Sequence, residues 1–335
     1  MKAIALLSGG LDSTLAIKVV QEQGIEVEAV NFVFPFCRCD GKEGGKIEVE
    51  VVSEQLNVKV KVIGVLDEYL DMVKHPKYGY GKNLNPCIDC RIMMFQKAKE
   101  YMAKTGARFI ITGEVLGQRP MSQNRQSIAL IEKKSEMEGL VVRPLSAKLF
   151  EPTIPEKQGW LDREKLLGIQ GRSRKEQLSW VKKYDISGYA CPAGGCLLTD
   201  PQVSKRLRDL MDSGMLTLDS INLITYGRYL NLSKNFKLIV GRNEKDNTSL
   251  MKYVKDGDLV IQAKIKGPTA VGRGKLETAD LANALGIVAY YCQQDSSTIP
   301  VEYRVVPDGF KVEEVQNNFT EEMVLQYRID NARKS

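Results

Sequence analysis

Histidine is almost absent from this chain, because His75 is the only one among 335 residues. The chain therefore cannot form a multi-histidine zinc site, an iron site with two histidines, or a Ser-His-Asp triad that uses a histidine other than His75. Long apolar runs are also missing, and none approaches the ~18 residues that a membrane-spanning helix needs. We expect no membrane segment and a cytoplasmic protein.

Disulfide chemistry is not expected either, although the chain holds seven cysteines. An odd number of cysteines in a cytoplasmic chain argues against a disulfide scaffold. The composition is otherwise that of a globular protein, with 43% hydrophobic and 27% charged residues. The length allows two or three domains, each with its own core.

A glycine-rich loop near the start is the most informative motif. Residues 8–14 read Ser-Gly-Gly-Leu-Asp-Ser-Thr and directly follow a short apolar run. A strand that runs into two glycines and then into a helix presents backbone N–H groups that can bind phosphate. The loop lacks the Gly-Lys-Ser/Thr ending of a Walker loop. It predicts an ATP site rather than a plain turn, with phosphate contacts from Ser8, Gly9, Gly10, Asp12, Ser13 and Thr14.

The first half of the chain alternates strand and helix patterns, which predicts an α/β domain with a parallel sheet. The expected strands are 3–7, 26–33, 58–65, 108–113 and 140–145, and the expected helices are 15–23, 46–56 and 88–105. Ligands of such sheets bind at the carboxyl ends of the strands. We therefore expect Phe32, Gly113, Arg119 and Arg143 near the nucleotide.

The chain is expected to divide into a catalytic domain at 1–200, a linker helix and loop at 201–233, and a smaller α+β domain at 234–335. Residues 151–200 would be a helical, cysteine-bearing extension of the first domain. Residues 201–275 hold fourteen Lys and Arg against seven Asp and Glu. Such a basic segment favours a polyanion partner, although a solvated surface explains the charge equally well.

Four cysteines form a candidate metal or sulfur site. Cys87 and Cys90 lie one turn apart where a helix begins, and Cys191 and Cys196 flank a Pro- and Gly-containing loop. Structural zinc, an iron–sulfur cluster with three cysteine ligands, or a metal-free persulfide pair would each suit this spacing. The persulfide pair needs thiols of lowered pKa, which a helix N-terminus favours.

Several motifs in order resemble those of tRNA-thiolating enzymes of the ATP pyrophosphatase (PP-loop) superfamily. The motifs are the loop at 8–13, Asn-Pro-Cys-Ile-Asp-Cys-Arg at 85–91, Thr-Gly-Glu-Val-Leu-Gly-Gln-Arg-Pro at 112–120, Arg-Pro-Leu at 143–145 and Pro-Ala-Gly-Gly-Cys-Leu-Leu at 192–198. The nearest groups are the 4-thiouridine synthetases and the 2-thiouridylases. The resemblance implies an adenine nucleotide alpha hydrolase-like fold over about the first two hundred residues.

The resemblance also implies an activity: a tRNA uridine is adenylated at a carbonyl oxygen, and sulfur then displaces AMP. ATP and Mg²⁺ would be required, with Asp12 orienting Mg²⁺ or the phosphates. Cys87, Cys90 and Cys196 would be ligands of a [4Fe–4S] cluster or sulfur-transfer residues, with zinc as the alternative metal and Cys191 as the alternative ligand.

The chain departs from both groups in its C-terminal part. Residues 238–243 and the basic module around them weakly resemble the RNA-binding domain of NFACT proteins. No rhodanese-like sulfur carrier follows, so sulfur would arrive as sulfide or from a persulfide-carrying cysteine desulfurase. The expected partners are tRNA and that donor, and a homodimer is allowed. Cys37 and Cys39 could relay sulfur, and an ATP-dependent amidating ligase with structural zinc is the alternative function.

Overall fold

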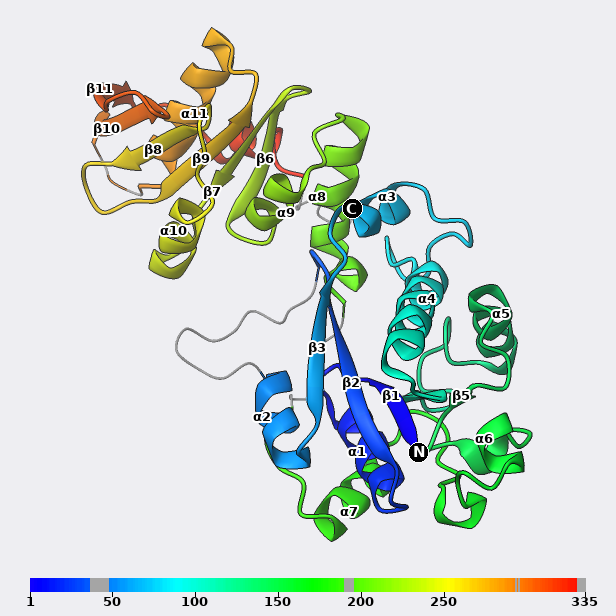
Figure 1. Cartoon of the computed structure of the whole chain (residues 1–335). Helices are drawn as coiled ribbons and strands as arrows, with labels where there is room; N and C mark the ends of the chain where they lie inside the picture. The colour runs from blue at the N-terminus through cyan, green and yellow to red at the C-terminus, as the bar shows by residue number, and fades with distance from the viewer. Residues whose placement is uncertain (37–47, 190–195, 293, 295, 330–335) are drawn as a thin grey trace. The chain divides into compact units, whose positions relative to one another are not determined.

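The structure is a computed structural model that describes residues 1–36, 48–189, 196–292, 294 and 296–329 (Figure 1). Contacts divide the chain into two compact units, Met1–Leu197 and Leu198–Ser335. In the part described, no helix is long and apolar enough to cross a membrane.

The first unit is built on a five-stranded parallel sheet with strand order β3-β2-β1-β4-β5. Its strands are β1 (Lys2–Leu6), β2 (Glu26–Val33), β3 (Lys59–Gly64), β4 (Phe109–Thr112) and β5 (Val141–Val142). The neighbouring strands β1 and β4 are mostly apolar and buried because helices cover both faces of the sheet. The parallel α/β fold expected from the sequence is confirmed.

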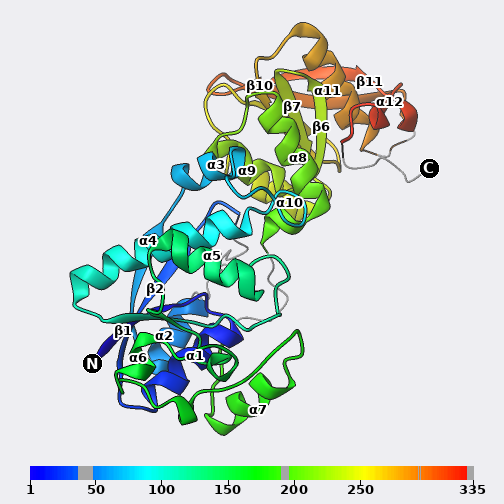
Figure 2. The ribbon, with the colours of Figure 1, turned by 90° about the vertical axis from the view of Figure 1, so that its right-hand side faces the viewer.

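Helices lie on both faces of this sheet (Figure 2). On one face, α1 (Leu11–Gln21), α2 (Glu48–Leu56) and α7 (Lys175–Lys183) share a core with Ala3, Ala5 and Ile111. On the other face, α4 (Cys87–Thr105) contacts β1 and β4, and α3 (Asp67–Lys74) and α5 (Arg125–Ser135) pack against α4. The remaining helical turns are η1 (Ala147–Leu149), α6 (Ile154–Lys157), η2 (Arg163–Lys165) and η3 (Leu197–Thr199).

The second unit holds a six-stranded antiparallel sheet with strand order β11-β10-β8-β9-β7-β6. The strands are β6 (Arg228–Ser233), β7 (Phe236–Val240), β8 (Leu259–Ala263), β9 (Thr269–Gly274), β10 (Thr298–Val305) and β11 (Lys311–Gln316). Its helices are α8 (Pro201–Asp212), α9 (Leu218–Ile224), α10 (Glu244–Met251), α11 (Thr278–Tyr290) and α12 (Glu321–Leu325). The apolar residues of α11 form one core with the sheet. The expected α+β class of the C-terminal part is confirmed.

Residues 201–233, expected as a linker, form α8, α9 and β6 of the second unit. Strand β6 pairs with β7 as a hairpin, so the segment contributes an edge strand to the sheet.

Candidate functional site

The glycine-rich loop joins the end of β1 to the start of α1. Gly9 has a φ of +75°, a left-handed conformation that glycine adopts at low cost, and Gly10 is the extended N-cap of α1. The side chains of Ser13 and Thr14 donate to the Gly10 carbonyl at 2.9 and 3.0 Å. The Ser8 and Ser13 hydroxyl oxygens lie 3.1 Å apart. These hydrogen bonds fix the loop beside the N–H groups of the first turn of α1. Such N–H groups can bind an anion.

Asp12 brings a carboxylate to this loop. Its Oδ2 accepts a hydrogen bond of 3.0 Å from Nε2 of Gln118, which lies beyond the end of β4. Its Oδ1 is buried without a hydrogen-bond partner among the described residues. An unsatisfied carboxylate oxygen beside a phosphate-binding loop fits a hard cation such as Mg²⁺.

Gly113 allows the end of β4 to approach the first turn of α1. A Cβ atom at Gly113 would lie 2.5 Å from the Asp12 carbonyl carbon and 2.5 Å from the Ser13 nitrogen. Such contacts are not tolerated between a side chain and backbone, so any other residue here would push the two segments apart. The structure thus places Gly113 directly against the loop.

The two arginines expected near the nucleotide have different surroundings. Arg143 is buried, and its Nε donates to Oε2 of the buried Glu114 at 3.1 Å. The Arg143 Nη1 donates to Glu132. Arg91 lies on the other oxygen of Glu114, at 3.3 Å. Arg143 therefore belongs to an internal ion-pair network, whereas Arg119 is exposed.

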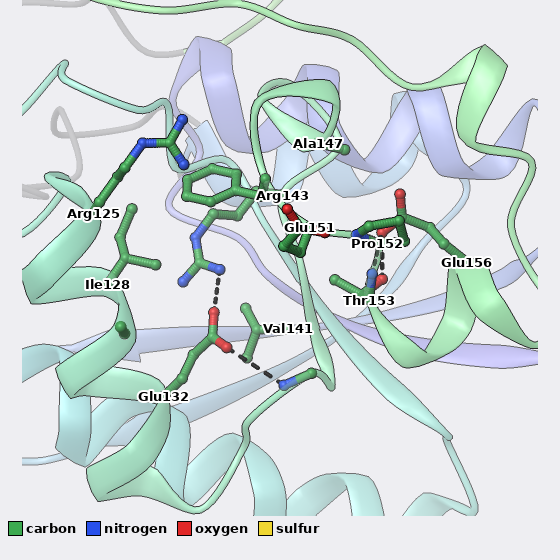
Figure 3. Close-up of a pocket in the computed structure, with 13 residues that line it drawn as sticks. Arg125, Ile128, Glu132, Val141, Arg143, Ala147, Glu151, Pro152, Thr153 and Glu156 are labelled. Carbon is green, nitrogen blue, oxygen red and sulfur yellow. Dashed lines mark hydrogen bonds and ion pairs between the residues drawn. The ribbon is translucent and has the colours of Figure 1, made fainter.

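A pocket of about 350 Å³ lies beside Arg143 (Figure 3). Arg125 and Arg143 stack over the ring of Phe150, at 5.3 and 5.7 Å from its centre. Figure 3 shows Arg143 directed to Glu132 at the wall of the pocket. Charged residues of both signs line it, so the pocket favours neither an anion nor a cation.

Cys87 and Cys90 lie in the first turn of α4, after the N-cap Pro86. Burial raises the pKa of Cys90 to about 12, and it also raises that of Cys87. The nearby Arg119 and Arg91 partly offset this effect at Cys87. The lowered pKa expected from the helix N-terminus is therefore wrong for the protein without a bound group, because loss of water around the sulfurs outweighs the helix dipole.

Tyr69 is a site residue that the sequence did not indicate. It lies on α3, only 2% exposed, and its hydroxyl forms a hydrogen bond with Cys90. Its own pKa is raised by burial and by the charges of Cys90, Cys196 and Cys87, so these three thiols lie around one hydroxyl. The buried face of the amphipathic segment 67–74 was the available signal.

Aromatic rings connect Tyr69 to the end of β2. The Phe34 ring lies 4.8 Å from that of Tyr69, and the Phe32 ring lies 6.2 Å from Phe34. Phe32 itself is buried at 6% exposure. Phe32 is thus linked through the Phe34 ring to Tyr69.

The three thiols are candidate ligands of a metal ion or cluster. Cys87, Cys90 and Cys196 are free cysteines, and thiolates are the usual ligands of iron–sulfur clusters and zinc. Among the described residues, however, no three Cys, His, Asp or Glu side chains are grouped to hold a metal ion. The three thiols nonetheless have the donor chemistry of a cluster or zinc site. Cys191, Cys37 and Cys39 lie outside the described residues.

Two parts of the chain match described protein families. Residues 1–148 match the family described as "Thiamine biosynthesis protein (ThiI)". Residues 227–328 match the family described as "NFACT protein RNA binding domain".

Curated relatives match the first of these parts. A "Probable tRNA sulfurtransferase" of Thermoanaerobacter sp. (strain X514) is 32% identical over 148 residues, which are 43% of this chain and 36% of the relative. One from Thermococcus kodakarensis is 26% identical over 196 residues, 55% of this chain and 44% of the relative. The "tRNA-specific 2-thiouridylase MnmA" of Marinobacter nauticus is 28% identical over 140 residues, 39% of this chain and 36% of the relative. The chain spans less than half the length of these relatives.

Solved structures share parts of the fold at low scores. A 4-thiouridine synthetase–RNA complex with bound ATP is 22% identical with a TM-score of 0.35, covering 66% of this chain and 52% of that one. The U34-tRNA thiolase NcsA from Methanococcus maripaludis with its [4Fe–4S] cluster is 16% identical with a TM-score of 0.34, covering 66% and 70%. Neither likeness carries an argument about the site. The family matches show that residues 1–148 are a ThiI-like PP-loop domain with homologues among the tRNA sulfurtransferases and thiouridylases, and that residues 227–328 are an NFACT-type RNA-binding domain.

Proposed function

We propose that the protein is an ATP-dependent tRNA sulfurtransferase that adenylates a uridine carbonyl and replaces its oxygen with sulfur, forming 4-thiouridine or 2-thiouridine. The observation that carries the proposal is the short path from the phosphate loop to the thiols. Gln118 donates to Asp12, and the next residue, Arg119, lies close enough to Cys87 to lower its pKa. The glycine-rich loop and the thiols thus lie in one unit and are linked through neighbouring residues, which supports the proposal.

Activation is the task of the loop. The amides that begin α1, with Ser8, Gly9, Gly10, Ser13 and Thr14, would hold the β- and γ-phosphates. Asp12 would hold Mg²⁺ through Oδ1, and the cation would offset the charge that develops on pyrophosphate. Arg119 is the exposed cation beside this path and would contact phosphate or RNA. In the same proposal residues 1–200 catalyse, 151–200 extend that domain, and 234–335 bind RNA.

The chemistry balances with sulfide as donor. The uridine carbonyl oxygen attacks the α-phosphate, pyrophosphate leaves, and the N3 proton is released. HS⁻ then adds to the activated carbon, the C–O bond breaks, AMP leaves with the uridine oxygen, and the sulfur proton moves to N3, which leaves the thiocarbonyl and a protonated N3. If a desulfurase persulfide on one cysteine is the donor instead, a second thiol completes transfer and the pair ends as a disulfide, which needs a thiol reductant.

We further propose that Cys87, Cys90 and Cys196, with Cys191 as alternative ligand, bind a [4Fe–4S] cluster, with zinc as the alternative. When bound, a cluster with one open iron would supply a site for sulfide. Anaerobic purification followed by iron, sulfide and zinc analysis tests this assignment. Protein that takes up neither metal on anaerobic reconstitution would overturn it and leave the metal-free thiol pair.

The test of function uses the full chain, Mg-ATP, sulfide and tRNA from a strain lacking the gene, under anaerobic conditions. We expect AMP and thiouridine in equal amounts, measured by nucleoside mass spectrometry. Asp12→Asn should lower both by about 100-fold, the usual cost of one charge-stabilising group. The exposed Asp67→Asn on α3 is the matched control and should retain activity. AMP release that requires ammonia, without thiouridine, would replace the proposal with an amidating ligase.

A further inference from the structure

Three arginines of the second unit lie near one another at the β6 edge of its sheet, and one tyrosine contacts two of them. Arg228 begins β6, Arg242 follows β7, and Tyr291 is the C-cap of α11. Arg328 follows α12 and forms an antiparallel bridge with Leu230 of β6. We call Arg228, Arg242 and Arg328 the arginine cluster. Four segments that are far apart in the sequence supply these side chains, so the fold positions them.

Packing fixes the orientation of Arg228. Its guanidinium carbon lies 4.3 Å from the centre of the Tyr291 ring, within the range of a cation–π contact. Its Nη1 donates to the Gly241 carbonyl at 2.9 Å. The Tyr291 side chain also forms a hydrogen bond with Arg328. The half-buried ring therefore holds two of the three guanidinium groups in defined positions.

The guanidinium groups of the arginine cluster affect one another's charge. Asp246 accepts a 2.7 Å hydrogen bond from Nε of Arg242 and is the acid whose charge also reaches Arg228. Burial lowers the pKa of Arg228, and the neighbouring charges of Arg328 and Arg242 lower it further. Like charges this close disfavour one another, and an anion placed among them would stabilise all three.

We propose that the arginine cluster and Tyr291 form the site at which the second unit holds a backbone phosphate of RNA. Guanidinium groups suit this ligand because they donate two parallel hydrogen bonds to phosphate oxygens and lose less hydration than an ammonium group. All four residues lie within the part that matches an RNA-binding family, 227–328. That the RNA is a tRNA rests on the proposed function, whereas the phosphate site itself does not.

The binding test measures tRNA affinity of the full chain by fluorescence anisotropy over a range of KCl concentrations. Arg242→Ala should weaken binding about tenfold and reduce the slope of log K against log salt by about one, the loss of one phosphate contact. Arg228→Lys keeps the charge but removes the planar stack and the bidentate donors, and it should weaken binding several-fold with a smaller change of slope. The second variant keeps the test valid if the first one unfolds.

The matched control is Lys311→Ala, an exposed cation on β11 at the opposite edge of the same sheet. It should change affinity by less than about twofold. If Arg242→Ala and Arg228→Lys, both folded by circular dichroism, also bind tRNA within that range, the proposal is wrong. Competition separates the ligand sources: excess inorganic phosphate should displace little tRNA, because one phosphate lacks the other contacts of the RNA. Displacement of tRNA by an acidic peptide as effective as that by unlabelled tRNA would also contradict the proposal.

This outcome is separable from that of the proposed function. Affinity is measured without ATP or a sulfur donor, so loss of binding in Arg242→Ala supports the phosphate site even if the parent protein forms no thiouridine. Thiouridine formation by the parent with normal tRNA binding by both arginine variants would leave the function intact and place the RNA contact elsewhere.

Discussion

The Tyr69 hydroxyl lies beside the thiols and can change their chemistry without being a ligand. It forms a hydrogen bond with Cys90, and the Tyr69 ring packs against Phe34 and Phe36. Tyr69→Phe keeps this packing and removes only the hydrogen bond. We expect thiouridine formation at saturating tRNA to fall by up to about tenfold, because a hydrogen bond contributes roughly 0.5–1.5 kcal/mol.

The readout that separates this role from a structural one is the split between kcat and KM. The KM for tRNA should stay unchanged in Tyr69→Phe while kcat falls. Tyr101→Phe is the control, because that hydroxyl bonds Glu28 and not a thiol. A Tyr69→Phe enzyme with parental kcat would show that the hydroxyl has no part in sulfur transfer.

At Gly113, the addition of a single methyl group would change the geometry of the glycine-rich loop. In Gly113→Ala the new Cβ would lie 2.5 Å from backbone atoms of Asp12 and Ser13, which cannot swing aside as a side chain can. We expect a loss of roughly 1–3 kcal/mol in the free energy of unfolding, as for other overpacked sites, and weaker ATP binding. Urea denaturation and calorimetric titration with ATP measure the two effects.

The matched control for Gly113 is Gly64→Ala at the end of β3, where a Cβ meets nothing within 4 Å. That variant should keep both the stability and the ATP affinity of the parent. Unchanged ATP affinity in Gly113→Ala would mean that the contact between β4 and α1 does not shape the phosphate site.

Glu28 gives the first unit a pH-dependent ion pair. Lys2 donates to Glu28 at 2.8 Å and lowers the pKa of that carboxyl, and Tyr101 donates to its other oxygen at 3.1 Å. Because the folded pKa lies below the ordinary 4.5, the stabilisation is present above that value and is lost as the pH falls through the lowered one. Glu28→Gln should lower Tm at pH 7 and become equal to the parent in acid.

Thermal melts between pH 2 and 7, at intervals of roughly one pH unit, measure this difference in Tm. Glu26→Gln is the control, because Glu26 meets the same Lys2 nitrogen but is 63% exposed. A constant Tm difference between Glu28→Gln and the parent across the whole range would rule out the ion pair as its cause.

At the scale of elements, a buried polar network ties α8 to the β6–β7 hairpin of the second unit. Lys237, only 2% exposed, lies 3.1 Å from Asp209 of α8, which also accepts hydrogen bonds from Tyr229 at 2.6 Å and Asn231 at 2.8 Å. Asp209→Ala would leave the Lys237 charge buried without its partner. We expect a loss of about 3–5 kcal/mol in the free energy of unfolding.

The exposed Asp212→Ala in the last turn of the same helix is the matched control and should change stability by less than about 0.5 kcal/mol. Urea denaturation followed by far-UV circular dichroism measures both variants. Equal stabilities would show that the network around Lys237 tolerates loss of its carboxylate.

The sequence predicted those elements whose apolar residues repeat regularly. Strand β2 has the expected bounds, and α4 begins within one residue of the expected start. Helix α1 begins at Leu11 rather than at residue 15, because the hydroxyls of Ser13 and Thr14 bond the Gly10 carbonyl inside the first turn. Strand β11 was not predicted, because it is exposed along almost its whole length and therefore lacks a clear alternation of apolar and polar residues.

The sequence predicts those parts of the candidate site in which the backbone geometry requires a particular residue type. It does not predict the parts that depend on which side chains meet in the folded structure. The loop glycines and the cysteine spacing are visible in the sequence. Glu114, Gln118 and Tyr69 are not, because each acts through a residue far along the chain: Arg143, Asp12 and Cys90 respectively. The same limit applies to the expected pKa of Cys87, which depends on burial more than on its place in the helix.

At the scale of the whole molecule, the proposed tasks fall in different units: activation and sulfur transfer in Met1–Leu197, and RNA binding in Leu198–Ser335. If each unit performs one of these tasks, a substitution in one unit should change only the kinetic constant that reports on its task. Asp12→Asn should lower the rate of thiouridine formation and leave the Kd for tRNA unchanged. Arg242→Ala should raise the KM for tRNA about tenfold and change kcat little, because the lost contact is made equally in the ground and transition states.

The double variant Asp12→Asn/Arg242→Ala tests whether the two units act independently. For sites without shared contacts, free energies add, so its loss of kcat/KM should equal the product of the single losses within about twofold. Steady-state thiolation assays and anisotropy on the four proteins provide the cycle. A loss well below that product would mean that RNA held at the arginine cluster is also needed to align the uridine with the activated phosphate, so the two units would act as one site.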